Sequence, residues 1–120
     1  MKSEPNFKGR YLRDAIPIRI GNLSSSISRL GFFIYKNKFH ATVVQLLQEC
    51  QSFAEWTFPD ADFETQLALS NLQADLAGWQ DDFENQKNNS DWRAEVNAAC
   101  EKWSQRLLEL SGLLHTGIPK

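Results

Sequence analysis

The stretch IPIRIGNLSSSISRLGFFI, residues 16–34, decides the fold class, because its apolar residues recur at helical spacing. Six Ile or Leu residues follow one another at alternating intervals of four and three: Ile16, Ile20, Leu23, Ile27, Leu30 and Ile34. This spacing places all six on one face of an α-helix. Pro17 fits the first turn, where its missing N–H loses no hydrogen bond. The sequence therefore predicts an amphipathic helix over residues 14–36.

Three further stretches show the same periodicity, and they predict helices over residues 39–57, 61–86 and 91–115. Phe39 begins the apolar stripe of the first of these, and Pro59 follows its end. Nothing in the chain indicates a pair of strands. Four amphipathic helices with short connections indicate an all-α fold, an antiparallel up-and-down four-helix bundle over residues 14–116. Pro5 and Gly9 interrupt residues 1–13, which we expect to be a short, irregular, flexible basic arm.

The composition favours one domain in a reducing compartment. The chain has 120 residues, close to the commonest domain size. No apolar run approaches the roughly 20 residues that span a bilayer, so we expect no membrane contact. The N-terminus lacks the apolar core of a secretory signal. Two cysteines fifty positions apart do not make a disulfide framework, and we expect a cytoplasmic protein.

Metal, cofactor and enzyme chemistry find little support in the sequence. Carboxylate-bridged metal centres in helical bundles use a Glu three positions before a His. The two histidines, His40 and His115, have Asn37 and Gly112 at that position. No Gly-rich phosphate loop, GxSxG or HExxH motif occurs. We therefore expect no metal, no cofactor and no catalytic residue, and favour a protein that is not an enzyme.

Charge is distributed unevenly along the chain. Residues 1–40 contain eight Lys or Arg and two acids, whereas residues 41–86 contain nine acids and no Lys or Arg. Two basic segments also carry aromatic residues, and their candidate anion-binding residues are Lys8, Arg10, Arg13, Lys36, Lys38 and His40. Such a combination can neutralise phosphates and stack on bases. The acidic pI of about 5.6 and a separation of about 30 Å along the helix argue against a nucleic-acid site.

A second ordered face lies beside the Ile/Leu seam of the helix over residues 14–36. Small residues recur on it, and its rim carries two aromatics: Gly21, Ser24, Ser28, Gly31, Phe32 and Tyr35. Small residues at this spacing allow another helix to approach closely. We interpret this face as a protein interface that pairs two chains, with enclosure inside the bundle as the alternative.

These patterns predict a non-enzymatic protein that acts through protein–protein contacts, as an adaptor or a homodimeric scaffold. One alternative is a nucleic-acid-associated regulator that uses the basic N-terminal arm. The other is a ligand carrier or an enzyme with a pocket between helices. The partner is therefore expected to be a second copy or another protein, with nucleic acid as the less favoured choice.

Overall fold

The computed structural model describes residues 4–112, and within that range every regular element is a helix. The elements are α1 (Glu4–Arg13), α2 (Ile16–Lys36), α3 (His40–Thr57), the 3-10 turn η1 (Phe58–Asp60), α4 (Phe63–Gln86) and α5 (Ser90–Ser111). The prediction of an all-α fold is confirmed. Among the described helices, none is both long and apolar enough to cross a membrane. The predicted last helix extended to residue 115, and its final residues lie outside the described range.

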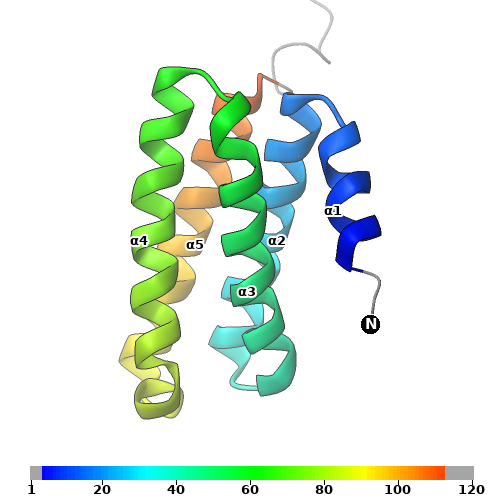
Figure 1. Ribbon diagram of the computed structural model, residues 1–120. Coiled ribbons are helices and arrows are strands. Elements are labelled where there is room, and N and C mark those ends of the chain that lie inside the picture. The colour runs from blue at the N-terminus through cyan, green and yellow to red at the C-terminus, as the bar shows by residue number, and fades with distance from the viewer. Residues whose placement is uncertain (1–3, 113–120) are drawn as a thin grey trace, which may run out of the picture.

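The four long helices, α2 to α5, lie side by side and alternate in direction (Figure 1). Helix α2 packs most extensively on α5 and next on α3, whereas α4 contacts α3 more than α5. Helix α1 lies at the edge of this group beside α2 and α3 (Figure 1). The apolar seam found in the sequence forms the centre, because Leu23, Ile27 and Leu30 are fully buried.

Residues 4–13 form helix α1, so the prediction of an irregular arm at this end is wrong. Pro5 lies in the first turn, where helices tolerate proline, and Gly9 is exposed with open space around it. Tyr11 anchors the helix: its ring stacks on Phe53 at 4.2 Å between centroids. Its hydroxyl lies 2.7 Å from Thr57 Oγ1 and donates to the Arg19 carbonyl at 3.1 Å. These contacts hold α1 against α2 and α3.

Side-chain caps set the starts of two helices. Asp62 accepts a hydrogen bond from the Thr65 N–H at 2.9 Å and begins α4, and this bond lowers the pKa of its carboxyl. Asn89 caps α5 by accepting hydrogen bonds from the backbone N–H groups of Asp91 and Trp92. Helix α2 begins after Ala15 without a side-chain cap.

The turn between α2 and α3 changes the expected place of Phe39. The sequence placed this residue on the buried stripe of the second predicted helix. In the structure Phe39 precedes α3, and 64% of its surface is exposed. In this turn the backbone is left-handed at Asn37 and at Phe39. The helical periodicity of α2 is therefore interrupted, and a new helix begins at His40. Phe39 therefore points to solvent while Val43, one turn later, is buried.

Candidate protein-contact surface

The small residues of α2 are used inside the chain, against α5. A methyl group at Gly31 would lie 2.7 Å from Cys100 Cβ and 2.9 Å from Asn97 Oδ1, so only glycine fits there. Ser24 donates to the Ser104 carbonyl, and the two serine hydroxyl oxygens lie 2.8 Å apart. Both Gly31 and Ser24 are buried. The close helix–helix contact exists, but its partner is α5 of the same chain.

This placement corrects the predicted interface residue by residue. Ser24 and Gly31 are covered by α5 and are not available to a second chain. Gly21 is half-buried, and Ser28 is exposed. Phe32 and Tyr35 also remain exposed, at 53% and 51%. The exposed members of the predicted interface are therefore Ser28, Phe32 and Tyr35, and the last two lie at the end of α2.

The exposed end of α2 continues into the following turn as one surface. We call it the turn surface, and its members are Phe32, Tyr35, Lys36, Lys38 and Phe39, all exposed. Half-buried Phe33 connects two of its aromatics, since the Phe33 ring centroid lies 5.6 Å from that of Phe32 and 5.6 Å from that of Phe39, edge to face in both cases. The Lys36 ammonium lies 5.6 Å from the Phe32 ring centroid, a cation–π contact.

The backbone of Phe39 is strained. Its φ of 58° and ψ of 52° lie in the left-handed region, which is a clear outlier for a bulky aromatic residue. Such a conformation costs of the order of 1–3 kcal/mol and persists only where the surrounding structure enforces it. A phenylalanine that is both strained and exposed contributes little to folding. This combination makes Phe39 a candidate for contact with another molecule.

The predicted anion-binding residues lie in several separate places. Lys36 and Lys38 belong to the turn surface. Lys8 lies 5.7 Å from the Trp56 ring centroid, and Arg10 lines a cleft beside α1. Arg13 is exposed near the end of α1.

His40 does not join them. Its ring packs edge to face on Phe83 at 5.5 Å, and its Nε2 lies 2.9 Å from Asn37 Oδ1. The six residues therefore do not form a single basic patch.

Opposite charges accumulate on opposite helices. Helix α2 contains three Arg or Lys and no acid, whereas α4 contains five acids and no Lys or Arg. Arg19 pairs with Asp60 at 2.9 Å, which connects the two charge classes near η1. Within the described residues, Lys36 and Lys38 form no ion pair. The turn surface therefore presents positive charge that no ion pair among the described residues compensates.

The described residues do not assemble a recognisable reaction centre. No group of three or more His, Cys, Asp or Glu residues among them could hold a metal ion. Cys50 and Cys100 are buried free thiols, and burial raises the pKa of both, that of Cys100 to about 12. A thiol with such a pKa is protonated at neutral pH and is a poor nucleophile.

Comparisons of the chain with protein families, with curated proteins and with solved structures give no match. Sequence reasoning assigned Phe39 to the core and overlooked Phe33 as a connecting ring. The one available signal was Asn37, a residue that favours left-handed turns and so resets the phase of the residues after it.

Proposed function

We propose that the protein is a non-enzymatic helical-bundle protein that binds an acidic segment of another protein through the turn surface. The observation that carries the proposal is the strained and exposed Phe39 beside two uncompensated lysines, Lys36 and Lys38. Exposed aromatic side chains supply apolar contact area, and neighbouring cations orient an acidic partner and speed its association. A partner segment with apolar residues and flanking carboxylates would complement both the aromatic side chains and the lysines.

A second copy of this chain is the less favourable occupant. In a two-fold dimer one patch meets its own copy. Around Phe32, α2 presents Arg29 and Lys36 and contains no acid, so a dimer through this surface would place cations against cations. Like charges brought together at an interface oppose association. We therefore expect light scattering to show a monomer at tens of micromolar.

The test uses affinity capture with two matched phenylalanine variants. Phe39→Gly removes the ring and suits the left-handed backbone, so the fold is retained. Phe63→Ala removes another exposed ring, 74% accessible, at the far end of the bundle. We expect Phe39→Gly to lower the amount of captured partner protein about tenfold and Phe63→Ala to change it less than twofold.

Zero-length cross-linking then identifies the contact. A carbodiimide joins lysine amines to carboxylates, and we expect links from Lys36 and Lys38 to acidic residues of the captured protein. Lys102 on α5 serves as the control lysine. Equal capture by the Phe39 and Phe63 variants would contradict the proposal. Removal of the captured material by nuclease would support the nucleic-acid alternative instead, and a dimeric parent protein would support self-association.

A further inference from the structure

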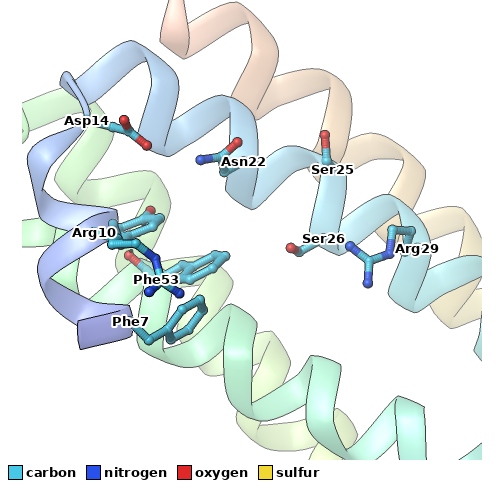
Figure 2. A pocket seen from close by; sticks show the side chains of 9 residues that line it. Phe7, Arg10, Asp14, Asn22, Ser25, Ser26, Arg29 and Phe53 are labelled. Atoms are coloured by element: carbon cyan, nitrogen blue, oxygen red, sulfur yellow. Dashed lines mark hydrogen bonds between the residues drawn. The ribbon is translucent and has the colours of Figure 1, made fainter. Parts of the chain in front are cut away.

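A cleft of about 320 Å³ lies between α1 and α2, with α3 as its floor (Figure 2). It exists because α1 folds back along α2 instead of extending away as an arm (Figure 1). The cleft is separate from the turn surface and shares none of its residues. Its volume is at the lower end of the range for small-molecule sites.

One half of the cleft is aromatic. Phe7 from α1 and Phe53 from α3 lie close together there, with ring centroids 5.8 Å apart. Phe7 is 36% exposed, whereas Phe53 is buried and stacked on Tyr11. The Arg10 side chain extends over the same region (Figure 2). A planar apolar group could pack on the Phe7 ring and beneath the Arg10 guanidinium.

The other half is polar and belongs to α2. Arg29, Ser25 and Asn22 line it, each exposed. Ser26 also lines the cleft, but its hydroxyl already donates to Glu49 Oε2 at 2.9 Å. The Arg29 guanidinium therefore supplies the charged donors at this end. Its parallel N–H groups are suited to an oxyanion such as phosphate.

Neither arginine of the cleft is neutralised by the part of the chain that the structure describes. Arg10 and Arg29 make no ion pair with any described residue. By contrast, Arg19, another arginine of α2, is paired with Asp60. Asp14 is the carboxylate among the lining residues, and it lies at the opposite end from Arg29 (Figure 2). Glu49 lies next to Ser26, from whose hydroxyl it accepts a hydrogen bond. An anion bound at Arg29 is thus held away from Asp14, which is left to accept a hydrogen bond from a ligand hydroxyl or amine.

We propose that this cleft binds an aromatic phosphate monoester, with the phosphate on Arg29 and the ring between Phe7 and Arg10. The inference goes beyond the proposed protein contact and does not depend on it. The same phosphate chemistry could reach the cleft as a free metabolite or as a phosphotyrosine side chain of a protein. Both carry a ring joined to a dianionic group.

The test uses two probes, inorganic phosphate and phenyl phosphate, titrated against the full chain by calorimetry and by ¹⁵N chemical-shift changes. Phenyl phosphate should bind about tenfold more tightly than inorganic phosphate, because only it engages the aromatic half. Arg29→Gln should weaken both probes about tenfold. Phe7→Leu keeps an apolar anchor for α1 and should weaken phenyl phosphate alone.

Arg13→Gln is the matched control, since it removes the same charge from α1 outside the cleft. We expect it to change either affinity less than twofold. If Arg13→Gln weakens binding as much as Arg29→Gln, the attraction is diffuse and no site exists. Absence of saturation at 10 mM phenyl phosphate, in a protein with normal circular dichroism, would also overturn the proposal. A phosphotyrosine peptide that binds more tightly than phenyl phosphate would identify the protein source.

Discussion

Helix α5 packs against two neighbours, α2 and α4, in opposite ways. On the α2 side the contact depends on small groups, with Gly31 directly over Cys100 and Ser24 hydrogen-bonded to Ser104. On the α4 side long side chains reach across a wider gap. The Trp103 indole donates to Asp75 Oδ2 at 2.8 Å, and a cleft of about 350 Å³ remains beside them.

The difference shows how one helix can be both a core element and an exposed one. Close approach on the α2 side excludes water and buries Cys100 completely. On the α4 side the connecting ion pair, Arg106 to Glu64 at 2.9 Å, is 43% and 68% exposed at its two side chains. The stability of a buried contact between small residues changes when a single methyl group is added, whereas exposed ion pairs contribute little to stability. Stability should therefore depend much more on the α2–α5 contact.

The largest expected effect comes from replacing a glycine by alanine in each of the two neighbours of α5, one in α2 and one in α4. Gly31→Ala would place Cβ 2.7 Å from Cys100 Cβ, which the backbone must move to accommodate. Gly78→Ala, on α4, meets open space. Both changes raise helix propensity by up to about 1 kcal/mol. We expect Gly78→Ala to gain most of that amount and Gly31→Ala to lose about 2 kcal/mol net through overpacking.

Urea denaturation followed by circular dichroism measures both glycine variants. The parent protein and each variant should show the same dependence of unfolding free energy on urea, so that the midpoints are comparable. Equal stabilisation by the two alanines would mean that α2 and α5 are not in close contact.

A second expected effect, about 2 kcal/mol, is a loss of stability at alkaline pH. Burial raises the pKa of Cys100 from 9.0 to about 12, and the nearby Asp75 and Glu101 charges add to the shift. The unfolded thiol therefore ionises first, so the stabilisation is complete below pH 9 and is lost as the pH rises toward 12. The slope is about 1.4 kcal/mol per pH unit, or about 2 kcal/mol by pH 10.5.

Unfolding free energies at pH 8 and pH 10.5 measure this loss, with Cys100→Ala as the comparison. The variant should retain more of its stability between the two values than the parent protein does. Burial also raises the pKa of Cys50, so Cys50→Ala should act in the same direction. An identical pH dependence in the parent protein and in both variants would show that the thiols are accessible to water.

The long helices could be predicted from the sequence because their apolar residues repeat over several turns. Helix α1 could not, since Pro5 and Gly9 dominate a segment of ten residues whose only helical signal is Phe7 and Tyr11 at a spacing of four. The stabilising contact of α1 is tertiary: Tyr11 meets Phe53 and Thr57, more than forty positions away. No local pattern reveals such a pairing.

The candidate sites show the same limit. The spacing of Gly21, Ser24, Ser28 and Gly31 predicted a close helix contact, but periodicity does not distinguish a neighbour in the same chain from one in another chain. The sequence indicated Arg10 as an anion-binding candidate but not Arg29. The two residues line one cleft only because α1 folds back along α2, and their positions in the sequence do not show this. Sites built from residues that only the tertiary structure brings together cannot be predicted from sequence spacing.

The smallest expected effect compares one polar contact from each side of α5. Ser24→Ala removes the buried hydrogen bonds to Ser104 and should cost about 1 kcal/mol, with no dependence on salt. Arg106→Gln removes the exposed pair with Glu64 and should cost at most about 0.5 kcal/mol, falling toward zero in 1 M NaCl, where the Debye length is about 3 Å. Urea midpoints at 0.05 M and 1 M NaCl separate the two cases. If Arg106→Gln were the more damaging change at high salt, α4 and α5 would be held together by buried contacts, and the contrast between the two sides of α5 would fail.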